Sequence, residues 1–119
     1  MAYAAMTKGS AALYVQLLLA AELMGLSDHL RAEFRQSQPA VYQRMERGVP
    51  EALAYAHRWV SEIQEIEATF QNLGLTPCIF RGLAETYQLI GGTRLGDETP
   101  DTVPQRTLKE TIRQLAAVD

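Results

Sequence analysis

The 119-residue chain contains one cysteine, Cys78, and has no excess of positive charge. A single cysteine excludes a disulfide within the chain and is typical of proteins from a reducing compartment, so we expect a cytoplasmic location. Lys and Arg number 11 against 14 Asp and Glu, which gives a formal net charge of −3 at pH 7. Because the arginines are also dispersed along the chain, nucleic acid is not expected as a partner.

Long apolar runs are missing as well. The most apolar stretch, 11–24, is interrupted by Gln16 and Glu22 and is too short to span a bilayer. The first residues have neither the charged start nor the cleavage site of a signal peptide. We therefore expect no membrane as partner, and a hydrophobic content of 47% predicts a single folded domain.

Helical periodicity runs through nearly the whole chain, and no segment alternates as a strand does. The sequence predicts an all-α fold, a bundle of about five to six helices with a long buried first helix from Ala2 to Met24. From Leu13 onward that helix is apolar almost all round, which predicts burial by several neighbours. Ser, Thr, Pro and Gly residues set the expected bounds of the later helices, which are 28–36 capped by Ser27, 39–47 closed by Gly48, 50–73, 77–91 capped by Thr76, and one that begins at Pro104.

The helix expected over 50–73 has the clearest amphipathic pattern. Its apolar stripe, at alternating steps of four and three residues, consists of Trp59, Ile63, Ile66, Phe70 and Leu73. The next helix would bury Phe80, Leu83, Ala84, Tyr87 and Ile90, and the last one Leu108, Ile112 and Leu115. These stripes predict helix packing and carry no chemistry of their own.

Few residues suggest chemistry. Lys8 lies among small and apolar residues, where a desolvated lysine can be a general acid or base, although it could equally reach water. Glu62 and Glu65 are three apart on one helix face, as an acid/base pair or a solvated surface would be. Gly9 permits either a close helix crossing or the approach of a ligand. His29, His57 and Cys78 lack the spacing of a metal or nucleophile site, so no metal is expected.

Several short segments occur in one order along the chain: Thr7-Lys8-Gly9-Ser10, Ser37-Gln38-Pro39, Arg58-Trp59-Val60-Ser61-Glu62-Ile63, Leu73-Gly74-Leu75 and Phe80-Arg81-Gly82-Leu83-Ala84-Glu85-Thr86-Tyr87. Together they resemble the C-terminal helical domain of the 6-phosphogluconate and 3-hydroxyisobutyrate (β-hydroxyacid) dehydrogenase superfamily, in a branch whose C-terminal domain has no assigned function. The resemblance implies a dehydrogenase C-terminal-like domain over 1–92. Residues 93–119 would be a linker and a C-terminal helix that packs on this domain or on a partner subunit.

The resemblance also implies partners and site residues. In such enzymes a Rossmann domain binds NAD or NADP, and the helical domain closes the substrate cleft and forms a homodimer. The family's catalytic lysine would fall just before Met1 and its asparagine on Ala4, while a later lysine–aspartate pair falls on Ser61-Glu62. These departures leave Lys8 as the expected catalytic residue, with Ser10, Trp59 and Glu62 as substrate-binding residues and no cofactor-binding residue in this chain.

Three functions stay open at this point. The chain could be the substrate-cleft and dimerisation half of an NAD(P)-dependent hydroxyacid dehydrogenase, inactive alone because 119 residues hold no βαβ cofactor unit. It could instead be a free-standing helical module, derived from that domain, that binds a partner protein or a small ligand. The third possibility is an independent enzyme that uses Lys8 and Glu62.

Overall fold

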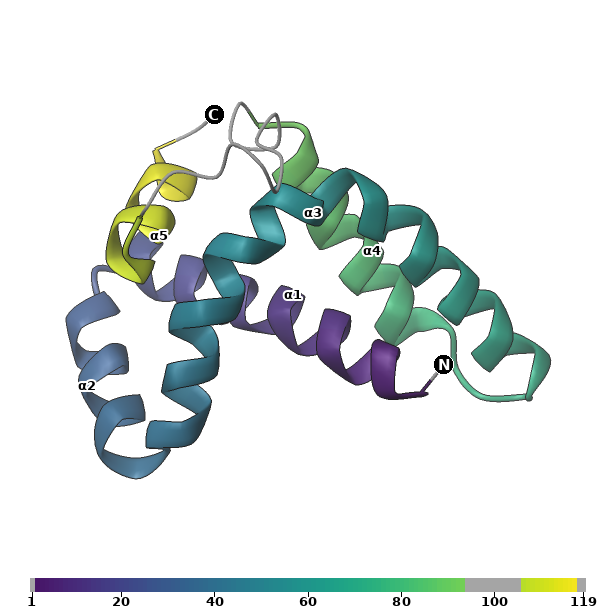
Figure 1. The fold of residues 1–119 in the computed structure, drawn as a ribbon, viewed down its shortest axis with the longest axis horizontal. Coiled ribbons are helices and arrows are strands. Elements are labelled where there is room, and N and C mark those ends of the chain that lie inside the picture. Colours follow the sequence, from purple (N-terminus) through teal and green to yellow (C-terminus); the bar gives the residue numbers. More distant parts are fainter. Residues whose placement is uncertain (1, 94–105, 118–119) are drawn as a thin grey trace.

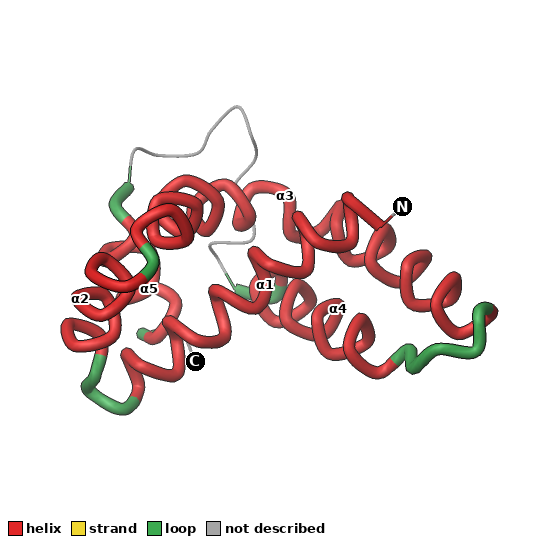
Figure 2. Tube along the Cα trace, turned by 90° about the horizontal axis from the view of Figure 1, so that it is seen from below, coloured by secondary structure: helices red, strands yellow, loops and turns green. Residues whose placement is uncertain are grey.

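The computed structural model describes residues 2–93 and 106–117. Within these ranges the chain forms helices and no strand, which confirms the predicted all-α fold (Figure 1). The helices are α1 (Ala2–Leu23), α2 (Ser27–Ser37), α3 (Pro39–Asn72), α4 (Cys78–Gly91) and α5 (Leu108–Ala116). Short loops join α1 to α2 and α3 to α4 (Figure 2). None of the helices in the described ranges is long and apolar enough to cross a membrane.

Helix α3 is 34 residues long and bends sharply, so that its two halves run in different directions (Figure 1). The first half pairs with α2 and the second half runs beside α4. Helix α1 contacts all the other described helices, including α3. The bend therefore gives α1 two different α3 surfaces to pack against.

The predicted break between two helices at Gly48 and Pro50 is wrong, because Pro50 lies inside α3. A proline lacks the N–H of the helical ladder, and its ring crowds the carbonyl one turn earlier, which bends a helix that is held on both sides. Packing supplies that restraint here, since Val49 and Leu53 are both at most 1% exposed. Pro50 thus accounts for the bend.

The core joins both halves of α3 to the other helices. Its largest fully buried side chains include Met45, Leu53, Ile63, Tyr87, Ile90 and Ile112. Each such aliphatic side chain contributes about 1.5–3 kcal/mol by leaving water. The stripe predicted on the middle helix is confirmed at Ile63 and Ile66, but Leu73 is 68% exposed because α3 ends at Asn72.

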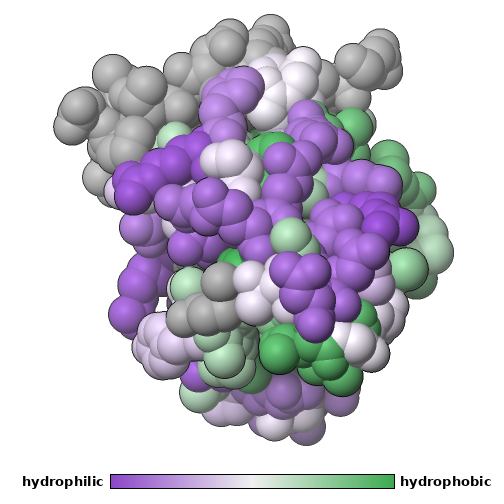
Figure 3. Space-filling model, turned by 90° about the vertical axis from the view of Figure 1, so that its right-hand side faces the viewer, coloured by the Kyte–Doolittle hydropathy of each residue, from purple (hydrophilic) through white to green (hydrophobic). Residues whose placement is uncertain are grey.

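Helix α1 packs against α2, α3, α4 and α5, which confirms its predicted burial by several neighbours, although Leu13 and Leu17 stay exposed. Its inner face carries small residues, and a Cβ built on Gly9 would lie 3.1 Å from Leu83 Cδ1 of α4. This confirms the close helix crossing at Gly9. The outer face of α1 exposes Tyr3, Met6, Leu13 and Leu17. Leu73, Leu75 and Ile79, which come after the last residue of α3, are also exposed. Figure 3 shows hydrophobic patches among hydrophilic side chains at this end of the molecule.

The helix ends match the sequence prediction in part. Gly25 adopts φ +73° and the Leu26 N–H donates to the Ala21 carbonyl at 2.8 Å, so α2 starts at once and Ser27 lies within it instead of capping it. Thr76 does accept a hydrogen bond from the Cys78 N–H, at 3.2 Å. Helix α5 begins with a capping box between Thr107 and Glu110 and buries the predicted apolar residues. Pro104 and most of the predicted linker lie outside the described residues.

Candidate functional site

Lys8 of α1 and Glu62 of α3 form an ion pair. Lys8 Nζ lies 3.1 Å from Glu62 Oε2, and the two side chains are 18% and 33% exposed. Arg58, one turn earlier on α3, places Nε 3.3 Å from the other carboxylate oxygen and is 71% exposed. The Glu62 carboxylate therefore lies between one shielded cation and one cation at the surface.

Trp59 completes the cluster around Lys8. The Lys8 ammonium lies 5.5 Å from the centre of the Trp59 ring, within the range of a cation–π contact. Tyr55 stacks on the same indole at 5.2 Å, and Tyr87 meets it edge-on at 5.5 Å. Because aromatic neighbours hold it from two directions, Trp59 is a rigid support for the lysine.

Tyr87 of α4 also fixes the main chain of Lys8. Its hydroxyl donates a hydrogen bond of 2.6 Å to the Lys8 carbonyl. Burial raises the pKa of the Tyr87 phenol well above its usual value, so the hydroxyl stays a neutral donor. Lys8 is thus held by its backbone to α4 and by its side chain to α3.

The charge state of Glu62 follows from its surroundings. Burial raises the pKa of this carboxyl, but the hydrogen bonds and charges of Lys8 and then Arg58 outweigh that effect, and the pKa lies below its ordinary value. The carboxylate is ionised at neutral pH, and it orients the Lys8 ammonium as an anchored cation. A fixed cation of this kind can polarise or hold an oxygen of a bound ligand.

A pocket of about 540 Å³ lies between α1 and the first half of α3, with Trp59 in its wall. Ser10 lines it, whereas Lys8 and Glu62 do not. The wall consists of Tyr3, Met6, Thr7, Ser10, Ala11, Tyr14, Arg44, Arg47, Gly48, Glu51 and Trp59. It combines an aromatic and apolar body with a few hydroxyl and charged groups, as small-ligand sites do.

Comparison with known protein families identifies the family of the chain. Residues 21–90 match the family model described as Domain of unknown function (DUF1932). The chain belongs to this family. No curated protein and no solved structure matches it. The matched part of the DUF1932 domain holds Arg44, Arg47, Trp59 and Glu62, while Lys8 and Ser10 precede it.

The predicted site residues fall into two neighbouring groups. The structure brings Lys8, Trp59 and Glu62 into contact, and it brings Ser10 and Trp59 into one pocket wall. Trp59 joins the two groups. Their catalytic and substrate-binding roles stay predictions.

Three charged residues of the pocket were missed from the sequence. Arg44, Arg47 and Glu51 follow each other at steps of three and four, which places them on one helix face. That signal exists only if the helix continues through Gly48 and Pro50. The predicted helix break therefore hid the shared face.

The remaining sequence candidates lie outside this site. His29, His57 and Cys78 are exposed, and Glu65 is exposed and does not join the cluster around Lys8. Among the residues that the structure describes, no group of three His, Cys, Asp or Glu side chains could hold a metal ion.

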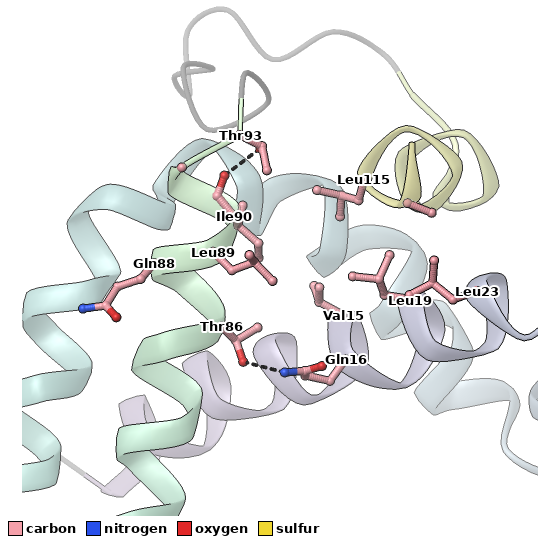
Figure 4. Close-up of a pocket in the computed structure, with 12 residues that line it drawn as sticks. Val15, Gln16, Leu19, Leu23, Thr86, Gln88, Leu89, Ile90, Thr93 and Leu115 are labelled. Atoms are coloured by element: carbon pink, nitrogen blue, oxygen red, sulfur yellow. Dashed lines mark hydrogen bonds between the residues drawn. The ribbon is translucent and has the colours of Figure 1, made fainter. Parts of the chain in front are cut away.

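A different pocket, of about 510 Å³, lies between α1, α4 and α5. Val15, Leu19 and Leu115 surround it, and the Gln88 amide points away from it (Figure 4). Its wall holds hydrogen bonds of 3.2 Å from the Gln16 amide to Thr86 and of 2.7 Å from the Thr93 hydroxyl to the Ile90 carbonyl. With no charged side chain in its described wall, it is the weaker candidate for chemistry.

Proposed function

We propose that this DUF1932 domain is the helical substrate-cleft and dimerisation half of an NAD(P)-dependent hydroxyacid dehydrogenase-like protein. The supporting observation is the ion pair of Lys8 with Glu62 beside Trp59. The resemblance to 6-phosphogluconate and 3-hydroxyisobutyrate dehydrogenases implies that the same segments face the cleft. The contact between these two segments, which are far apart in the sequence, supports the proposal.

Each residue has a role in this proposal. Lys8 would bind the hydroxyl oxygen of the substrate and act as the general acid/base, which takes up the hydroxyl proton as hydride leaves and returns it in the reverse reduction. Glu62 would orient the lysine, and Trp59 would shield it from water. The described residues include no strand followed by a glycine-rich turn, so they do not fit a dinucleotide. The nucleotide would be bound by a separate domain.

The outer face of α1 supports the dimerisation half of the proposal. Leu13 and Leu17, which do not line the pocket beside Trp59, are 50% and 43% exposed, and apolar side chains exposed on one helix face are typical of a protein contact. A second copy packed across a two-fold axis would cover the same face on both chains.

Reconstitution tests this function. The coding region next to this domain would be searched for a nucleotide-binding domain, the two domains would be joined or co-expressed, and reduction of NAD⁺ or NADP⁺ would be followed with a panel of 2- and 3-hydroxy acids. The proposal predicts turnover only when both domains are present. A neighbouring coding region without a nucleotide-binding domain would instead favour a free-standing module that binds a small ligand, which the pocket of about 540 Å³ supports.

A further inference from the structure

We infer that the pocket between α1 and α3 binds a small, singly charged organic anion, with Arg44 and Arg47 on the anionic group and Trp59 against the apolar body. This inference concerns the isolated chain and holds whether or not a dehydrogenase contains the domain. The site lies beside the Lys8–Glu62 pair and does not include either residue.

Arg44 and Arg47 line the pocket, and their charges have no ionic partner among the described residues. Both lie on one face of the first half of α3 and are exposed, and neither they nor Glu51 forms an ion pair with another described residue. Two like charges one turn apart destabilise a helix slightly. A bound anion would relieve that repulsion, and guanidinium groups suit oxyanions because they offer several N–H donors in a plane.

The opposite wall suits the rest of such a ligand. Ser10 and Tyr14 come from α1 and carry hydroxyl groups that can donate to a bound oxygen. Trp59 of α3 adds an apolar aromatic ring to the pocket wall, and Tyr55 and Tyr87 hold that ring in place. A wall that combines charged and hydroxyl groups with an aromatic ring suits a ligand with a polar head and an apolar body.

The balance of charge selects a single negative charge. Arg44 and Arg47 supply two positive charges and Glu51 one negative charge, so the wall carries a net charge of +1. Lys8 adds little to the field because its partner Glu62 neutralises it. A monocarboxylate matches this wall, while the second charge of a phosphate monoester would face Glu51.

Fluorescence of Trp59 gives a direct test, because it is the only tryptophan in the chain. We expect 3-phenylpropionate to change that fluorescence with a saturable dependence in the millimolar range or below. The uncharged 3-phenylpropanamide should bind about tenfold or more weakly, since it lacks the charge-assisted hydrogen bonds. Equal binding of the amide, tighter binding of phenyl phosphate, or no saturable change with 3-phenylpropionate would each overturn the inference.

Variants locate the site. Arg44→Gln and Arg47→Gln should each weaken 3-phenylpropionate binding about five- to tenfold, and the double variant should abolish it. Arg113→Gln on α5 is the matched control, because it removes the same charge from an exposed residue outside this pocket. Circular dichroism would verify that all variants fold. Unchanged affinity in both single variants, or an equal loss in the control, contradicts the site. Because this test needs no nucleotide or second domain, its failure is distinct from failure of the proposed function.

Discussion

Glu62 Oε2 lies 3.1 Å from Lys8 Nζ, and this contact ties the second half of α3 to α1. The pair is partly shielded, since its side chains are 33% and 18% exposed. It is therefore expected to contribute more to the free energy of unfolding than an ion pair in open solvent, although solvent still screens it.

Glu62→Gln should lower the free energy of unfolding by about 1 kcal/mol, measured by urea denaturation. Arg58→Gln, which removes the outer and more exposed partner, should change it by less than about 0.5 kcal/mol. If both variants change the free energy of unfolding by the same amount, the contact of Glu62 with Lys8 adds nothing beyond its contact with Arg58.

The same carboxylate predicts a dependence on pH. Its pKa is lowered by folding, so the stability that it contributes is fully present above the unfolded value of about 4.3 and is lost as pH falls through the lower folded value. The difference in unfolding free energy between the wild type and Glu62→Gln should be constant near neutral pH and shrink below about pH 4. A difference that grows on acidification would contradict the pairing.

Tyr87→Phe tests the anchor of Lys8 to α4. The variant keeps the buried ring and deletes the hydroxyl that donates to the Lys8 carbonyl. We expect a loss of about 1 kcal/mol in unfolding free energy. Tyr3→Phe, at a side chain that is 83% exposed, is the control and should have no measurable effect. A neutral Tyr87→Phe would show that the hydrogen bond does not hold α1.

Two glycines should respond in opposite directions to added side chains. A Cβ at Gly82 would meet nothing within 4 Å, so Gly82→Ala should stabilise α4 by about 0.5–1 kcal/mol through helix propensity. Gly9→Val should destabilise the protein by about 1–3 kcal/mol, since Leu83 already lies 3.1 Å from the Cβ position. Thermal denaturation of the two variants would check the close crossing of α1 and α4.

The outer face of α1 predicts self-association. Leu13→Glu places a charge on that face and should convert a dimer into a monomer at micromolar concentration, measured by sedimentation velocity. Leu73→Glu changes an equally apolar, 68% exposed residue at the end of α3 and should leave the dimer intact. A wild-type chain that is monomeric at the same concentration would remove dimerisation from the proposal.

Much of the fold follows from local sequence signals, and the site does not. Periodicity predicts the helices, because apolar residues at helical spacing are buried: Ile63 and Ile66 on α3, and Leu108, Ile112 and Leu115 on α5. The continuity of α3 through Pro50 depends on packing around it, which a local proline rule does not contain.

The remaining differences between the predicted and the observed site arise from contacts between segments that are distant in the sequence. Lys8 and Glu62 were selected by their chemistry and by resemblance, and nothing in the helical periodicity predicts that they touch. Arg44, Arg47 and Glu51 could be grouped only once the two predicted helices were known to be one. Pairings across a fold are set by how helices pack, and single-sequence patterns do not determine that packing.

Lys8 provides the most direct test of the proposed cleft, because the chain has only one other lysine, the exposed Lys109 of α5. In the domain reconstituted with its nucleotide-binding partner, kcat for hydroxy-acid oxidation would be compared for Lys8→Met and Lys109→Met. A positioned general acid/base accounts for about 10²–10⁴-fold in rate, so Lys8→Met should lower kcat by about 10²-fold or more while Lys109→Met leaves it unchanged. If Lys8→Met folds normally and keeps kcat within about twofold of the wild type, Lys8 has no catalytic role and the cleft proposal is contradicted.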